Sequence, residues 1–78
     1  MNKKTKKEKR SLTKREQFMF DLLSKATGPV SVDALLDGYK TYNAGNLVAA
    51  HIYKLRRKIA DKYIIESVSG VGYQMFPV

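Results

Sequence analysis

Apolar residues along the chain recur at helical spacing up to about residue 62 and at strand spacing after it. Residues 1–11 carry no apolar periodicity, so we expect a mobile tail that no buried surface orders. The capping box Thr13-Lys14-Arg15-Glu16 predicts the start of a first helix, because each end of the box satisfies an amide of the other. That helix is expected to stop near Thr27-Gly28-Pro29. Its core stripe consists of Met19, Phe20 and Leu23.

Two further helices follow in the pattern. The second is short and begins after Ser31, whose hydroxyl can cap it. Its apolar positions recur at i, i+3, i+4 and i+7, and they are Val32, Leu35, Leu36 and Tyr39. Residues 41–46 have the composition of a turn, and a third helix is predicted from about Leu47 to Lys62. Its buried stripe is Val48, Ile52, Leu55 and Ile59, and its opposite side carries Asn46, Ala50, Tyr53 and Arg57.

From Tyr63 the period is that of strands, with apolar residues on both sides of Ser69-Gly70-Val71-Gly72. This pattern predicts a hairpin whose glycines supply the positive φ angles of a turn. Three helices followed by a C-terminal β-hairpin give an α+β fold, and this order is typical of a winged helix-turn-helix domain. We place that domain at residues 12–78.

Composition narrows the kind of partner. The chain has 78 residues and a net charge of +8, which allows one small domain with an exposed working surface rather than a closed catalytic cleft. It has no cysteine and one histidine, so we expect no cofactor, no metal site and no enzymatic activity. No apolar run is long enough to span a bilayer, so we expect a soluble cytoplasmic protein at the nucleoid rather than at a membrane. The charge favours a polyanion, above all double-stranded DNA.

The third helix is apolar on one side and basic with small residues on the other, as a helix must be to rest on a core and enter a major groove. Candidates for contact with base edges are Ala49, Ala50, Tyr53, Lys54 and Arg57. Candidates for phosphate contact are His51, Arg56 and Lys58. Candidates for contact from the hairpin, or wing, are Ser67, Ser69 and Gly70. Alternatively, residues 54–58 are a solvated face at a helix C-terminus, and the glycines serve the turn alone.

The N-terminal tail is a second block of basic residues. It could follow the DNA backbone by non-specific phosphate attraction, or it could act as solubilising charge alone. The basic residues concerned are Lys3, Lys4, Lys6, Lys7, Lys9 and Arg10.

The first helix is apolar over about half of its circumference, more than a one-sided helix needs. Phe18 and Leu22 cause this width, because they lie beside the core stripe. We expect the two side chains to contact a second copy or another partner. Alternatively, they fold under the hairpin or under residues 76–78.

Four segments together resemble the effector domain of OmpR/PhoB-type response regulators. They are Leu12-Thr13-x-x-Glu16, residues 31–36, residues 51–59 (HIYKLRRKI) and residues 67–73 (SVSGVGY). The resemblance implies a third helix in the major groove, a wing at the minor groove, and paired subunits that often bind direct repeats. It also implies base contacts for Ala49, Tyr53 and Lys54, phosphate contacts for His51 and Arg56, and wing contacts for Ser67 and Ser69.

The chain departs from that family pattern at four places. Ala49 stands where aspartate is common and Ser69 where a minor-groove arginine is common, so we expect an atypical DNA site. No receiver domain is present, and the basic tail replaces the four-stranded sheet that usually precedes the first helix. We therefore expect a standalone domain whose control comes from elsewhere. The loop at residues 40–46 is short, and in the family this loop commonly contacts RNA polymerase, which disfavours activation by that route.

These observations predict a sequence-specific DNA-binding transcription regulator. Two alternatives would use the same fold. One is an adaptor that binds RNA polymerase or another regulator through Phe18 and Leu22, and the other is an architectural DNA binder from a mobile element. Absence of an enriched DNA sequence from a random pool, together with co-purification of a protein partner, would favour the adaptor, whereas the two DNA-binding roles differ only in genetic context.

Overall fold

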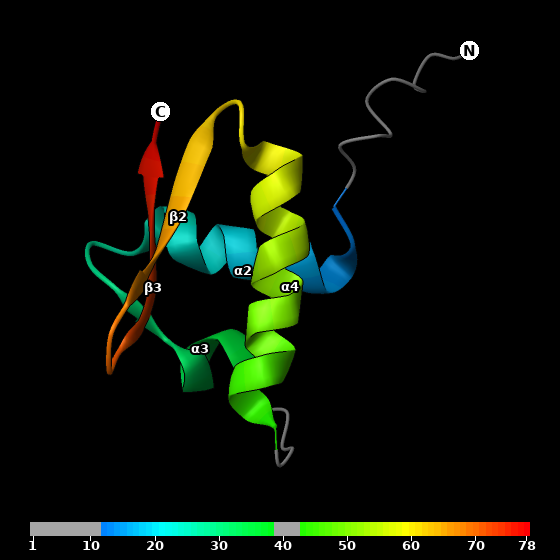
Figure 1. The fold of residues 1–78 in the computed structure, drawn as a ribbon, viewed down its shortest axis with the longest axis vertical. Helices are drawn as coiled ribbons and strands as arrows, with labels where there is room; N and C mark the ends of the chain where they lie inside the picture. The colour runs from blue at the N-terminus through cyan, green and yellow to red at the C-terminus, as the bar shows by residue number, and fades with distance from the viewer. Residues whose placement is uncertain (1–11, 39–42) are drawn as a thin grey trace.

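The computed structural model describes residues 12–38 and 43–78 and shows a three-helix domain with a small sheet (Figure 1). The elements in chain order are α2 (Lys14–Lys25), β1 (Val30–Ser31), α3 (Val32–Leu36), α4 (Ala44–Ile59), β2 (Tyr63–Val68) and β3 (Gly72–Pro77). The predicted α+β winged helix-turn-helix is confirmed. The expectations for residues 1–11 and for Tyr39 lie outside the described residues.

Helices α2 and α3 begin at the caps that the sequence predicts. The Thr13 hydroxyl accepts a hydrogen bond from the Glu16 amide at 3.1 Å, and the Glu16 carboxylate accepts one from the Thr13 amide at 2.9 Å. The Ser31 hydroxyl accepts from the Ala34 amide at 3.1 Å. Helix α3 ends at Leu36, because Asp37 takes a left-handed conformation with φ of 55°. The helix is therefore shorter than its predicted apolar stripe.

Helix α4 begins at Ala44 rather than Leu47 and ends at Ile59 rather than Lys62. At its start, the Leu47 amide donates to the Asn43 carbonyl at 2.8 Å, so that residues with a turn-like composition form the first helical turn. At its end, the Lys62 amide bonds to the Ile59 carbonyl at 2.9 Å, which closes a tight turn into β2. Local composition therefore misplaced the start of α4, and the turn at its end stops the helix at Ile59, before the predicted Lys62.

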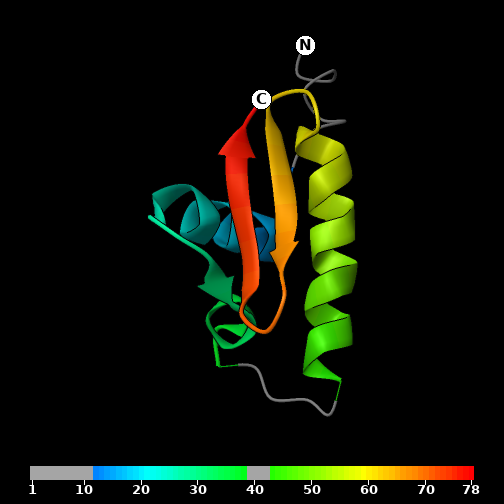
Figure 2. The ribbon, with the colours of Figure 1, turned by 60° about the vertical axis from the view of Figure 1, so that its left-hand side comes forward.

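The sheet has three antiparallel strands in the order β1-β3-β2 (Figure 2). The hairpin of β2 and β3 is as predicted, with Val68 opposite Gly72 beside the turn. The third strand was not predicted: Val30 and Ser31 pair with Tyr73 and Gly72. A strand of two residues has no periodicity of its own, so only its partner reveals it.

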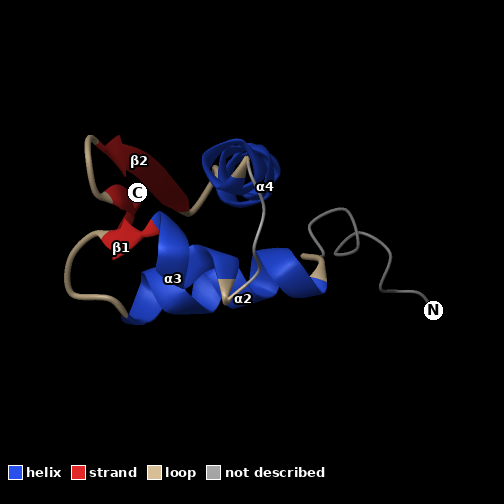
Figure 3. Cartoon of the chain, turned by 90° about the horizontal axis from the view of Figure 1, so that it is seen from below, coloured by secondary structure: helices blue, strands red, loops and turns tan. Residues whose placement is uncertain are grey.

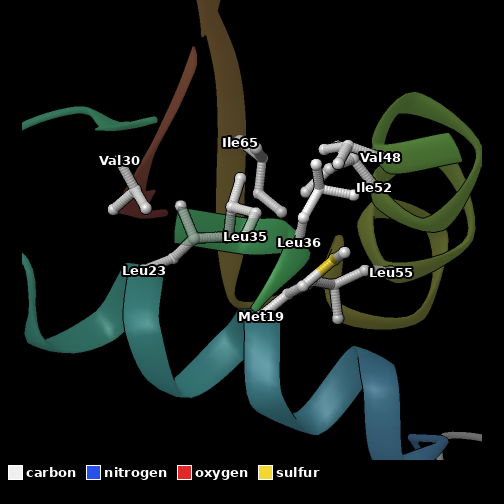
Figure 4. Packing of buried hydrophobic residues seen from close by; sticks show 9 residues of the cluster. All are labelled: Met19, Leu23, Val30, Leu35, Leu36, Val48, Ile52, Leu55 and Ile65. Atoms are coloured by element: carbon white, nitrogen blue, oxygen red, sulfur yellow. The ribbon is translucent and has the colours of Figure 1, made fainter. Parts of the chain in front are cut away.

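All six elements except β3 contribute to one core of nine buried side chains (Figure 4). These are Met19, Leu23, Val30, Leu35, Leu36, Val48, Ile52, Leu55 and Ile65. The helices lie on one side of the sheet (Figure 3). Where α2 approaches β2, the rings of Phe20 and Tyr63 pack edge to face with their centres 5.4 Å apart. Among the described residues, no helix is both long and apolar enough to cross a bilayer.

Two polar contacts fix α2 against the other helices. The Arg15 guanidinium donates through Nη1 to the Leu36 carbonyl at 3.1 Å, which ties α2 to the end of α3. The Lys58 ammonium lies 2.7 Å from Oε1 of Glu16, which ties α2 to the last turns of α4. Glu16 is only 1% exposed, so the capping-box residue of α2 is also a buried partner of α4.

Candidate nucleic-acid interface

Helix α4 offers one side to the core and the other to solvent. Val48, Ile52 and Leu55 of the predicted stripe are buried, and Ile59, its fourth member, is partly buried against the core. The exposed residues of α4 are Gly45, Asn46, Ala49, Ala50, Tyr53, Lys54, Arg56 and Arg57. The helix contains no acidic residue, so its solvent face carries positive charge alone. A helix of this kind can approach a polyanion without like-charge repulsion.

Side-chain size changes along this exposed face. Ala49 and Ala50 stand in the first half of α4, whereas Tyr53, Lys54 and Arg57 stand one to two turns later. Small side chains allow the helix backbone to approach base edges, and long side chains reach them from further away. The exposed face of α4 therefore carries small side chains in its first half and long side chains in its second half.

The turn of the β2–β3 hairpin lies at the same end of the molecule as the first turns of α4 (Figures 1 and 2). Ser67 and Ser69 are exposed, as is Gly70 at the tip. Gly70 has a φ of 77°, and the Val71 amide closes the turn on the Val68 carbonyl at 3.0 Å. The predicted turn chemistry of Gly70 is confirmed. The tip of the wing and the first half of α4 are therefore exposed at the same end of the molecule.

Residues 7–75 match a family model described as the C-terminal domain of transcriptional regulatory proteins. The chain belongs to this family. Its fold and its OmpR/PhoB-type resemblance agree with that membership, which implies DNA binding in transcription regulation. A comparison with curated proteins found no match.

Within this family fold, Tyr53 and Arg57 form a pair on the solvent side of α4. The guanidinium carbon of Arg57 lies 5.6 Å from the centre of the Tyr53 ring, and Nη1 donates to the Tyr53 hydroxyl at 3.5 Å. Residues four apart on a helix are neighbours, so spacing alone brings them into reach. The spacing was visible in the sequence, but the stacking was not.

Lys58 differs from the other basic residues of α4. Its ammonium is held by the Glu16 carboxylate, on the flank of the helix that faces α2. Burial by itself raises the pKa of the Glu16 carboxyl, but the bonds from Lys58 and Thr13 and the positive charge of Lys58 together lower that pKa below its ordinary value. The Glu16 carboxyl is therefore ionised at neutral pH. We assign Lys58 a structural ion pair, which the sequence did not reveal because its partner lies 42 residues away.

Gly72 also has a role other than the predicted turn chemistry. It lies in β3, and its φ is not in the left-handed region, unlike that of Gly70. A side chain built there would overlap the Val30 carbonyl and come within 2.9 Å of the Ser31 Cα. The glycine is required by the close approach of β1. The turn interpretation of Gly72 is therefore wrong.

The remaining candidates divide into those that the structure describes and those that it does not. His51 is half-buried at the edge of the α4 stripe. Phe18 and Leu22 are partly buried and pack against the core cluster, and Arg15 stacks on the Phe18 ring at 5.8 Å. An interface at Phe18 and Leu22 stays a prediction. The basic residues of the tail lie outside the described residues, and the part that is described contains no cluster of side chains suited to a metal ion.

Proposed function

We propose that this domain binds double-stranded DNA in a sequence-specific manner, with α4 in the major groove. The observation that carries this proposal is the solvent face of α4. This face is basic, contains no acidic residue, and has small side chains in the first half of the helix. A major groove about 12 Å wide admits a helix of this shape. The β2–β3 turn, at the same end of the molecule, is suited to the adjacent minor groove or backbone.

Each exposed residue has a proposed role in this arrangement. Base edges are contacted by Ala49, Ala50, Tyr53, Lys54 and Arg57. Phosphates are contacted by Arg56 and His51, and the neighbouring backbone by Ser67, Ser69 and Gly70. Lys58 is left out, because its ammonium is engaged with Glu16. Two copies of the domain would bind direct repeats, as paired subunits often do in the family that it resembles.

The test is selection of bound duplexes from a random pool with the purified chain, followed by affinity measurements on the enriched site and on a scrambled duplex. Ala50→Glu should lower affinity for the enriched site by on the order of tenfold or more, because it places a carboxylate in the groove. Lys54→Ala should reduce the ratio of affinities for the two duplexes. Lys25→Ala is the matched control, because it removes the same charge from the exposed end of α2.

Two results would contradict the proposal. One is the absence of any enriched sequence. The other is an equal effect of Lys25→Ala and Lys54→Ala on the affinity ratio, which would mean that the charge of the domain matters and the position on α4 does not.

A further inference from the structure

We propose that Arg57 selects a guanine in the major groove and that Tyr53 is the residue that positions it. This inference rests on the proposed function and adds one base and two distinct roles to it. The interaction that carries it is the stacked and hydrogen-bonded contact between the Arg57 guanidinium and the Tyr53 side chain on the solvent face of α4.

The direction of the contact places the guanidinium where a base can be reached. Side chains on a helix incline toward its N-terminus, so Arg57 bends back over Tyr53 by about one turn. This inclination places the Arg57 guanidinium nearer the middle of α4 than its own backbone, and so nearer the first half of the helix, which lies at the same end as the wing. The contact therefore presents Arg57 to the same stretch of groove as Ala50 and Tyr53.

The face of the helix favours a base over a phosphate. Ala50, Tyr53 and Arg57 follow one another at spacings of three and four residues, opposite the buried stripe. A helix lying in a groove turns the side opposite its own core toward the groove floor, whereas its flanks face the two backbones. Arg56 lies about 40° around the helix from the buried Ile52 and about 100° from the buried Leu55, so it lies on a flank. Two neighbouring arginines thus have different targets.

The chemistry of the pair favours guanine in particular. A guanidinium has five N–H donors in a fixed plane, and the bond to the Tyr53 hydroxyl uses one of them. The others can bond both O6 and N7 of guanine, which are the two acceptors on its major-groove edge. Tyr53 is 58% exposed, so its ring holds the guanidinium without burying it. Stacking on the ring reduces the rotamer freedom that Arg57 would otherwise lose on binding.

The first part of the test compares the sites that variants select from the random pool. Arg57→Lys keeps the charge but removes the planar fork, so one guanine of the wild-type site should lose its preference by about fivefold or more. Tyr53→Leu should weaken the preference at that same base pair, and Tyr53→Phe should restore most of it, because the ring is retained. Arg56→Lys is the control, and it should leave the preference at that base pair unchanged.

The second part replaces the selected guanine with 7-deazaguanine, which lacks the N7 acceptor. The wild-type chain should bind this duplex about fivefold or more weakly than the natural one, and Arg57→Lys should bind both nearly equally. An unchanged guanine preference in Arg57→Lys overturns the inference while the proposed function stands. A wild-type chain that enriches no sequence overturns both. Unfolding midpoints of the four variants confirm that each is folded.

Discussion

At the scale of single residues, the absence of a side chain at Gly72 permits the close pairing of β1 with β3. Gly72 stands opposite Ser31 in the β1–β3 pairing, and the Val30 carbonyl occupies the space that a side chain at position 72 would take. Pairing of Val30 and Ser31 with β3 anchors the hairpin beside the start of α3. A methyl group at position 72 would meet backbone on β1, which cannot rotate away as a flexible side chain can.

We therefore predict that Gly72→Ala destabilises the domain by about 2 kcal/mol or more, since it forces β1 away from β3. Urea unfolding followed by far-ultraviolet circular dichroism measures the change. Gly45→Ala is the matched control: nothing lies near a side chain at that helical position, so stability should stay the same or rise by up to about 1 kcal/mol. Equal effects of the two substitutions would show that β1 is not closely packed on Gly72.

At the scale of secondary-structure elements, one ion pair ties α4, the helix proposed to enter the major groove, to α2. Glu16 is used twice, once to cap α2 and once to hold Lys58 of α4. A buried carboxylate needs such partners, because removal from water is costly for the charged form. The orientation of α4 relative to α2 therefore depends on a charge and not on apolar packing alone.

This pair makes stability depend on pH in a defined direction. The pKa of Glu16 is lower in the folded protein than its ordinary value of 4.5. The stabilisation is therefore complete above about pH 4.5, the unfolded value, and it is lost as pH falls through the lower folded value. We predict that Glu16→Gln, which keeps the cap but loses the charge, is less stable than wild type by about 1–3 kcal/mol at pH 7.

The measurement is the difference in unfolding free energy between wild type and Glu16→Gln from pH 7 to pH 3, and it should shrink below about pH 4.5. Lys58→Met should be destabilising at pH 7 as well, because it leaves a buried carboxylate without its cation. Lys62→Met removes an exposed charge four residues later, in the turn between α4 and β2, and serves as control. A difference that stays constant with pH would mean that the charge of Glu16 does not contribute.

Elements whose signals are local in sequence were predicted correctly. The Thr13 and Ser31 caps and the Val48, Ile52 and Leu55 stripe each occupy a few neighbouring residues, so the sequence alone exposes them. Strand β1 and the Glu16–Lys58 pair depend on contacts between residues far apart in the chain, so no local sequence pattern predicts them. The start of α4 was misplaced because the Leu47–Asn43 hydrogen bond of the first turn overrode the turn-like composition of residues 43–46. Its end was misplaced because the Lys62 amide bonds to the Ile59 carbonyl in a turn that closes the helix.

At the scale of the whole molecule, positive charge is concentrated rather than evenly spread. The solvent face of α4 has no acidic residue, and the described acids of the helices lie on α2 and α3. The N-terminal tail adds six basic residues and one acid to a chain whose net charge is +8. Such a distribution attracts DNA before any base is contacted, and this attraction decreases as salt rises.

Removal of residues 1–11 should separate the non-specific electrostatic attraction of DNA from the recognition of its bases. Each lysine or arginine that neutralises a phosphate contributes up to about 0.9 to the slope of log affinity against log salt. We predict that the shortened chain binds the enriched and scrambled duplexes more weakly by the same factor, with a shallower slope for both. Titrations at four salt concentrations measure this, and an unchanged unfolding midpoint is the control. If the shortened chain instead lost its preference for the enriched duplex while keeping its salt slope, base recognition would reside in the tail rather than in α4. Because the base-contacting candidates all belong to α4, the ratio of the two affinities is the quantity that should survive the deletion.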